Sequence, residues 1–127
     1  MHRSKLSAVM IDCDEASYER GVEFWSRALG RAPDPDQEPE EKYTNLVDAP
    51  DQPRVSLQKV AEPSSFHLDI ETDDVEAEVA RLEKLGAVRK YKIRTWWVMR
   101  APTGHDFCVI RPQSERFATD PANTWDE

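Results

Sequence analysis

The sequence has no long apolar run. No segment approaches the roughly 18 apolar residues of a membrane-spanning helix. The first residues, MHRSKLSAVMIDCDE, also lack the apolar core and small-residue cleavage site of a secretory signal peptide. Apolar residues make up 39% and charged residues 33% of the 127-residue chain. We therefore expect one soluble domain with a hydrophobic core, located in the cytoplasm and without a membrane partner.

Cysteine is scarce as well, and the 17 basic residues are outnumbered by 25 acidic residues. The two cysteines, Cys13 and Cys108, fit a reducing compartment, and a disulfide between them is the less favoured alternative. The formal net charge is -8. An acidic chain is repelled by nucleic-acid phosphates and by anionic membranes, so neither is an expected partner. The charge suits a cationic ligand, although solubility alone is the simpler explanation.

The first half of the chain contains a strand followed by a helix. Residues 6–13 predict an apolar strand, and residues 15–29 predict an amphipathic helix that ends at Gly30. The proline-rich residues 31–42 allow at most a brief edge strand, and residues 42–48 and 54–60 predict two more strands. The predicted buried stripe of the helix is Tyr18, Val22, Trp25 and Leu29.

The second half repeats this pattern. Residues 66–72 predict a strand, and residues 75–85 predict a helix that ends at Gly86. Asp73 is the predicted N-cap of this helix, and Glu76 completes an acidic capping box. The predicted buried stripe is Val75, Val79, Leu82 and Leu85. Three more strands are predicted at residues 87–93, 95–101 and 106–111.

The order β-α-β-β-β thus occurs twice, and such a repeat constrains the fold more than any single residue. We predict an α+β fold in which two βαβββ modules form a concave half-barrel sheet, with module one at about residues 5–60 and module two at about 65–112. Together they form the single domain, residues 1–112. Residues 113–127 are predicted to be a polar, loosely ordered tail, although its Phe117 and Trp125 are candidates for docking on the domain.

One face of the strand at residues 66–72 is polar. Because Leu68 and Ile70 must face the following helix, His67, Asp69 and Glu71 face away from it, toward the concave side. Three polar groups on such a face are costly unless they are solvated, paired or bound to a ligand. His67 is therefore a candidate acid, base or ligand contact. A histidine hydrogen-bonded within the sheet, with no further role, is the alternative.

Aromatic residues supply candidate walls for the cavity. Trp96 and Trp97 are adjacent on a predicted strand, so one points to each face. One should pack under the helix and the other should line the cavity, and the sequence leaves open which does which. Tyr43 is a further candidate that reaches the cavity from the first module.

Several segments resemble a known family. HLDIETDDVEAEVARLEKLGA followed by WVMRAPTGHDFCVIRP is similar to the second module of the glyoxalase/bleomycin-resistance (vicinal oxygen chelate) superfamily. LSAVMIDCDE with FWSRALG resembles its first module, and VSLQKVAEP resembles its fourth strand. The likeness is greatest to the small glyoxalase-like proteins and covers about residues 6–112. It implies the paired βαβββ fold, a small-molecule cavity and a homodimer, but no particular activity.

The resemblance implies an incomplete metal site. Metal-dependent members carry one ligand on each of four strands. His67 matches one of these places and Cys108 stands at another, but neither Ser7 nor Ala8 at the third nor residues 56–58 at the fourth is a usual ligand. We therefore expect no metal or other cofactor, and a divalent metal is the less favoured alternative.

The resemblance also implies that Cys108 lies beside His67. A nucleophilic Cys–His pair is chemically possible. No third group that would orient the pair is evident, so inert packing is the favoured interpretation of Cys108, and likewise of Cys13.

Three hypotheses for function remain. The first is a metal-free glyoxalase-like protein that binds an unidentified small molecule. The second is a lyase, isomerase or dioxygenase of the superfamily with an unusual site at His67. The third is a binding protein that sequesters a cationic antibiotic. The acidic loop at residues 34–41 suits the third as a lid over the cavity, although a solvated connection is the simpler interpretation.

Overall fold

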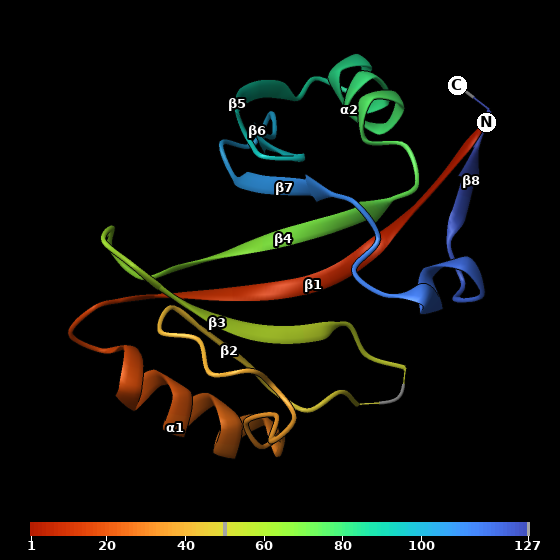
Figure 1. Ribbon diagram of the computed structural model, residues 1–127. Helices are drawn as coiled ribbons and strands as arrows, with labels where there is room; N and C mark the ends of the chain where they lie inside the picture. Colours follow the sequence, from red (N-terminus) through yellow and green to blue (C-terminus); the bar gives the residue numbers. More distant parts are fainter. Residues whose placement is uncertain (50, 127) are drawn as a thin grey trace. The chain divides into compact units, whose positions relative to one another are not determined.

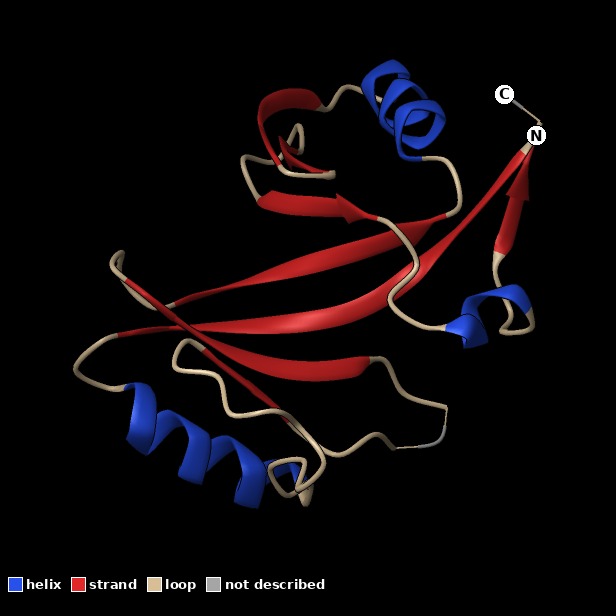
Figure 2. Cartoon of the chain, viewed as in Figure 1, coloured by secondary structure: helices blue, strands red, loops and turns tan. Residues whose placement is uncertain are grey.

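The structure is a computed structural model that describes residues 1–49 and 51–126. The chain divides into two compact units. One unit contains residues 8–67, and the other contains residues 1–7 and 68–127. The elements in chain order (Figures 1 and 2) are β1 (His2–Asp14), α1 (Tyr18–Leu29), β2 (Tyr43–Asn45), β3 (Arg54–Val60), β4 (Ser65–Thr72), α2 (Val75–Lys84), β5 (Val88–Ile93), β6 (Trp96–Arg100), β7 (Asp106–Ile110), the 3-10 helix η1 (Glu115–Ala118) and β8 (Asn123–Trp125).

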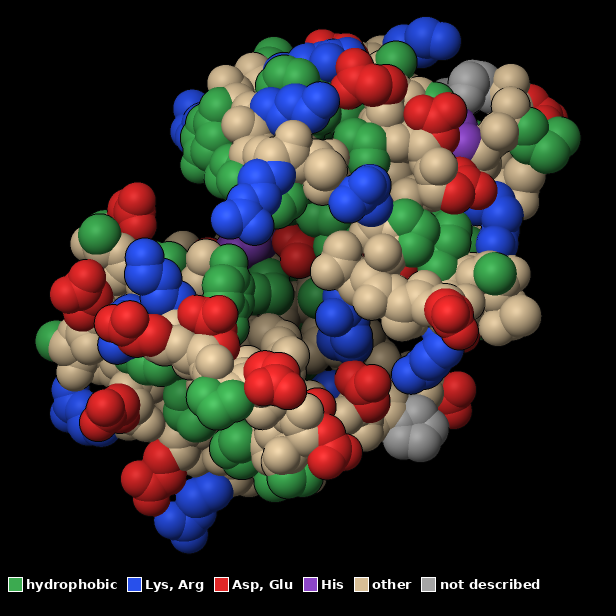
Figure 3. All heavy atoms as spheres, viewed as in Figure 1, with side chains coloured by type: hydrophobic (Ala, Val, Ile, Leu, Met, Phe, Trp, Pro, Cys, Tyr) green, Lys and Arg blue, Asp and Glu red, His purple; other side chains and the backbone are tan. Residues whose placement is uncertain are grey.

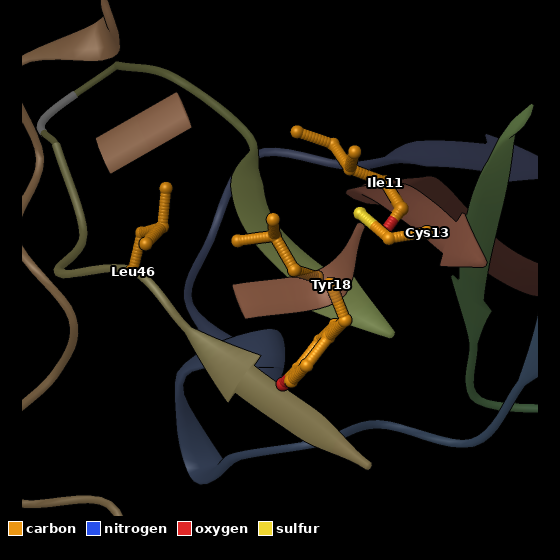
Figure 4. Packing of buried hydrophobic residues seen from close by; sticks show 5 residues of the cluster. Ile11, Cys13, Tyr18 and Leu46 are labelled. Atoms are coloured by element: carbon orange, nitrogen blue, oxygen red, sulfur yellow. The ribbon is translucent and has the colours of Figure 1, made fainter. Parts of the chain in front are cut away.

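In the unit of residues 8–67, β3 is the central strand. It pairs in parallel with β1 and antiparallel with β2. Helix α1 lies along one face of these strands (Figure 1). The core between the helix and the strands, part of which is shown in Figure 4, consists of Ile11, Cys13, Tyr18, Leu46 and Leu57.

In the unit of residues 1–7 and 68–127, four strands follow the order β4-β7-β6-β5. β4 and β7 are parallel, and the other neighbours are antiparallel. Helix α2 packs against β5, β6 and β7. The core under this helix consists of Val79, Leu82, Ala87, Met99 and Val109.

The two units share one plan, which confirms the predicted repeat and the α+β class. In each, the first strand is parallel to the last strand of its module, and the helix follows the first strand directly. The first module is the less regular copy. Where the second module has β5, the first has only an isolated bridge between Pro33 and Leu46. Proline cannot donate to a strand ladder, which explains why the proline-rich segment here forms no full strand.

The first residue of α1 and the N-cap residue of α2 differ from those predicted from the sequence. α1 begins at Tyr18 rather than at residue 15, because the Asp14 carboxylate accepts the backbone N–H of Ser17 at 2.9 Å and forms a turn first. α2 begins at Val75 as predicted, but Asp74, not Asp73, is its N-cap, and the Asp74 carboxylate accepts the N–H of Ala77 at 3.0 Å. Asp73 instead accepts the backbone N–H of Arg3 at 2.8 Å.

The predicted buried stripes are correct except at their last residues. Leu29 is 44% exposed and Leu85 is 65% exposed, so the C-terminal turn of each stripe lies outside the core. Gly30 ends α1 in the left-handed conformation, with a φ of 67°, as its position at the helix end predicts.

The C-terminal segment contacts the start of β1 through Phe117 and Trp125, the two residues that the sequence offered for docking. β8 pairs antiparallel with the start of β1, from His2 opposite Trp125 to Ser4 opposite Asn123. Phe117 is 4% exposed and lies 5.2 Å from the guanidinium of Arg3. The tail is ordered because these aromatic side chains find apolar and cationic partners on β1.

Charged side chains of both signs are interspersed on the face drawn in Figure 3. Among the described residues, neither helix has the length and apolar content needed to cross a membrane.

Candidate functional site

The sheet face opposite α1, in the unit of residues 8–67, is polar. Ile11 and Cys13 belong to the core under α1, so Asp12 between them points to the other face. Leu57 also faces the helix, which leaves Ser56 and Gln58 on the polar face.

Hydrogen bonds between neighbouring strands hold this face in place. Ser56 Oγ donates to Asn45 Oδ1 at 2.7 Å. Gln58 Nε2 donates to the Tyr43 hydroxyl at 3.0 Å. Tyr43 therefore lies on the face for which the sequence made it a candidate, and its hydroxyl is positioned by an amide from β3.

His67 and Asp12 form the only pair on this face that joins an imidazole to a carboxylate among the described residues. The distance from His67 Nδ1 to Asp12 Oδ2 is 2.5 Å, and the two side chains are 17% and 11% exposed. The carboxylate accepts the Nδ1 proton and so fixes the orientation of the ring. A carboxylate that orients an imidazole is a common support for general acid–base chemistry.

The second oxygen of Asp12 is buried without a hydrogen-bond partner. Oδ1 meets no donor in the described part of the chain, and the residue is only 8% exposed. A buried acceptor left without a donor costs about 1–3 kcal/mol. The face thus contains an acceptor that an incoming donor or cation would satisfy.

Sequence reasoning missed Asp12. The signal was present, since Asp12 lies between two apolar residues of a strand and alternation alone puts it on the face opposite the helix. Its partner could not be found in this way. Residues 12 and 67 are far apart in the sequence, and pairing between strands is needed to bring them together.

In the second unit, Asp69 and Glu71 face away from α2, as predicted. Ile70 between them packs against the core under that helix. Asp69 stands opposite Cys108 in the parallel pairing of β4 with β7. Glu71 is 3% exposed and accepts a hydrogen bond from Ser7 Oγ at 2.5 Å.

The structure resolves which tryptophan packs under the helix. Trp97 Nε1 donates to Glu76 of α2 at 2.8 Å, and the guanidinium of Arg89 lies 4.9 Å from its ring. Trp97 therefore faces α2. Because side chains alternate along a strand, Trp96 points to the opposite face, the one that carries Cys108.

The two cysteines occupy different environments. Cys13 is buried and Cys108 is half-buried, and both are free thiols. Burial, followed by the charges of Asp12 and Asp14, raises the pKa of the Cys13 thiol. A protonated, buried thiol is a poor nucleophile, which agrees with the packing role expected for Cys13.

Neither unit by itself brings together three potential metal ligands among the described residues. His67 and Asp12 are the donors on the polar face of residues 8–67, and Asp69 and Cys108 are the donors of the other unit.

The model of the glyoxalase-like domain family matches residues 8–110 of the chain. The chain belongs to this family. The match includes both helices and the strands of both modules, and it leaves out the first residues of β1 and the C-terminal tail.

Solved structures have the same fold as this glyoxalase-like protein. A methylmalonyl-CoA epimerase in complex with methylmalonyl-CoA and NH4+ is 16% identical, with a TM-score of 0.61 over 88% of this chain and 96% of that one. The Mn(II)-bound glyoxalase from Novosphingobium aromaticivorans is 16% identical, with a TM-score of 0.62 over 87% of this chain and 40% of that one. A variant of the Streptomyces coelicolor methylmalonyl-CoA epimerase in complex with 2-nitronate-propionyl-CoA is 16% identical, with a TM-score of 0.58 over 87% of this chain and 95% of that one.

No curated protein matches the sequence. At these identities the solved structures establish the fold and do not assign an activity.

Proposed function

We propose that this glyoxalase-like protein binds a small molecule on the sheet face opposite α1, in contact with Asp12, His67 and Tyr43. The supporting observation is the buried Oδ1 of Asp12, an acceptor without a hydrogen-bond donor among the described residues. A ligand that offers an N–H, an O–H or a positive charge at this point would remove the cost of that burial.

The neighbouring groups define the rest of the ligand. Gln58 and Tyr43 offer polar contacts that are already held in place by their own hydrogen bond. The corresponding face of the second module carries Asp69, Cys108 and Trp96, and we propose these as the contacts for a ligand on that face, considered by itself. Glu71 supports this face through Ser7. Trp97 is not included, because its indole is bonded to α2.

A catalytic role is the second candidate, and the His67–Asp12 pair favours it. An imidazole oriented by a carboxylate can take a proton from a bound substrate and return it, as lyases and isomerases require. Elemental analysis of protein purified without chelator or affinity metal distinguishes a metal-dependent enzyme from a metal-free one.

Sequestration of a cationic antibiotic is the third candidate. The net charge of -8 and the acidic loop at residues 34–41 support it. A host that expresses the chain should then tolerate a higher concentration of such a drug. A host whose sensitivity is unchanged would exclude this function for the drugs tested. We further propose that the protein acts in the cytoplasm as a homodimer.

Native mass spectrometry after incubation with a metabolite extract tests the proposed site. The wild-type chain should retain a small molecule that is lost in Asp12→Asn and in His67→Ala. His105→Ala is the matched control, because His105 is exposed and its side chain bonds only to its turn neighbour Thr103 among the described residues. Equal retention by all four proteins, each with an unchanged melting temperature, would contradict the proposed site.

A further inference from the structure

A separate cavity lies on the α1 side of the unit of residues 8–67. Its volume is about 360 Å³, which is in the range of small-molecule pockets. Ile11 and Cys13 contribute to its wall, and both belong to the core that faces α1. The cavity therefore lies on the α1 side of the strands, and of the residues named above for the polar face it shares Asp12.

Three aromatic rings line this cavity. Phe24 and Trp25 lie 5.1 Å apart between ring centroids, and Trp25 and Phe66 lie 6.0 Å apart. Both contacts are edge-to-face, with interplanar angles of 88° and 83°. Edge-to-face contacts leave ring faces available to a further ring. Phe24 and Phe66 are 61% and 60% exposed, so a ring bound there would remove much apolar surface from water.

A single cationic side chain lines the same cavity. The side chain of Arg20 is exposed and forms no hydrogen bond or ion pair among the described residues, and its charge contributes to lowering the pKa of the Asp14 carboxyl. The one acidic residue of the wall, Asp12, is already bonded to His67. A guanidinium binds a carboxylate through two parallel hydrogen bonds, and it is more weakly hydrated than an ammonium group.

We infer that this cavity is a second binding site, which takes flat aromatic carboxylates. The ring lies against Phe24, Trp25 and Phe66, and the carboxylate pairs with Arg20. The apolar floor of Ile11 and Cys13 excludes ligands that are charged at the ring end. This site does not depend on the function proposed for His67 and Asp12.

Titration of the full chain with 2-naphthoate tests the inference. Binding is followed by the NMR signal of the Trp25 indole N–H, assigned with Trp25→Phe. We expect saturation with a Kd of about 1 mM, a value typical of a ligand with so few atoms. The uncharged 2-naphthamide should bind about threefold more weakly, because an exposed ion pair contributes little more than that.

Four variants locate the probe. Phe24→Ala should weaken binding by about fivefold through loss of an aromatic contact, and Arg20→Gln should weaken it to the level of the amide. Arg27→Gln is the matched control, because Arg27 lies on the same helix, is 80% exposed at its side chain and pairs with Glu23. His67→Ala should bind the probe unchanged.

Several outcomes would overturn the inference. They are no saturation, no shift of the Trp25 signal, equal affinity for acid and amide, or loss of binding in His67→Ala. The melting temperature of each variant distinguishes a lost contact from a lost fold. Phe24 and Arg20 are both exposed, so neither substitution should unfold the chain.

Discussion

The two thiols show how environment separates two residues of the same type. Cys13 lies under α1, and Cys108 lies half-buried on β7. Only the thiolate form of cysteine reacts readily with alkylating reagents. Burial, together with the charges of Asp12 and Asp14, raises the pKa of Cys13, so both access and ionisation disfavour its reaction.

We therefore predict that iodoacetamide at pH 8 modifies Cys108 well before Cys13. Peptide mass spectrometry over time should show one fast site and one that reacts only after denaturation. Cys108→Ser should leave the folded chain almost unmodified. Faster labelling of Cys13 would mean that α1 does not cover it as described.

Gly21 of α1 lies close to the side chain of Cys13. It lies within α1, and a Cβ added there would meet Cys13 Sγ at 3.0 Å and Leu57 at 3.8 Å. Gly→Ala in a helix normally stabilises by about 1 kcal/mol, but overpacking a core costs about 1–3 kcal/mol. Gly21→Ala should therefore destabilise the chain by about 1 kcal/mol in urea denaturation.

The double variant Gly21→Ala/Cys13→Ala isolates this contact. Removing the sulfur makes room for the new methyl group, so the effect of Gly21→Ala should change sign in the Cys13→Ala background. If Gly21→Ala changed the stability equally in both backgrounds, the contact with Cys13 Sγ would not be the cause of the destabilisation.

At the scale of the element, α2 is attached to both ends of the chain. Glu78 is fully buried, and its carboxylate accepts hydrogen bonds from Arg81 at 2.8 Å and from His2 at 2.7 Å. The guanidinium of Arg81 also lies 3.8 Å from the ring centroid of Trp125 on β8. One carboxylate thus joins the helix to β1 and, through Arg81, to the C-terminal strand.

These contacts make stability depend on pH in a defined direction. Burial by itself raises the pKa of Glu78, but the hydrogen bonds from Arg81, His2 and Ser4 outweigh it and hold the pKa below 4.5, its ordinary value. A carboxylate whose pKa is lower in the folded state than in the unfolded state stabilises the fold at pH values above its unfolded-state pKa. This stability is lost as the pH falls through the folded value.

Glu78→Gln should therefore destabilise the chain by about 3 kcal/mol at pH 7, because Arg81, His2 and Ser4 lose a charged partner. The difference from wild type should shrink as the pH falls below 4.5, the ordinary value, and through the lower folded-state pKa of the native carboxylate. Thermal melts at several pH values measure both effects. Glu83→Gln is the control, since its pair with Arg89 is 40% and 31% exposed and should contribute less than about 1 kcal/mol. A constant difference across pH would contradict this account.

For the whole molecule, we predict a homodimer, as the family resemblance implies and as is common among symmetric oligomers. Light scattering should then give about twice the 14.6 kDa of the chain. A mass of about 14.6 kDa at micromolar concentration would exclude a dimer under those conditions.

Periodicity predicted the fold because most signals in this chain agree with one another. Both helices, the strands that follow them and the polar side of β4 were evident from alternation and from the glycines at the helix ends. Alternation also placed Asp69 and Glu71 opposite Ile70. The choice between Trp96 and Trp97 was not predictable, because it depends on the register of β6 against its neighbours.

The errors arose where a local signal competed with a distant contact. Asp73 has the sequence position of an N-cap, yet it bonds to Arg3 near the start of the chain. The tail has the composition of a disordered segment, but two aromatic residues are enough to attach it to β1. The pairing of Asp12 with His67 also joins distant residues, so periodicity alone could not reveal the main feature of the candidate site.

The division of β1 between the two units affects how the chain can fold during synthesis. Residues 1–7 are synthesised before residues 8–67, yet they belong to the same unit as β8. Residues 8–67 can form their own core early, whereas His2 must wait for Trp125 and Glu78. Until β8 has been synthesised, the first residues of β1 expose an edge that β8 later covers. This interval is the period of greatest risk of aggregation for the nascent chain.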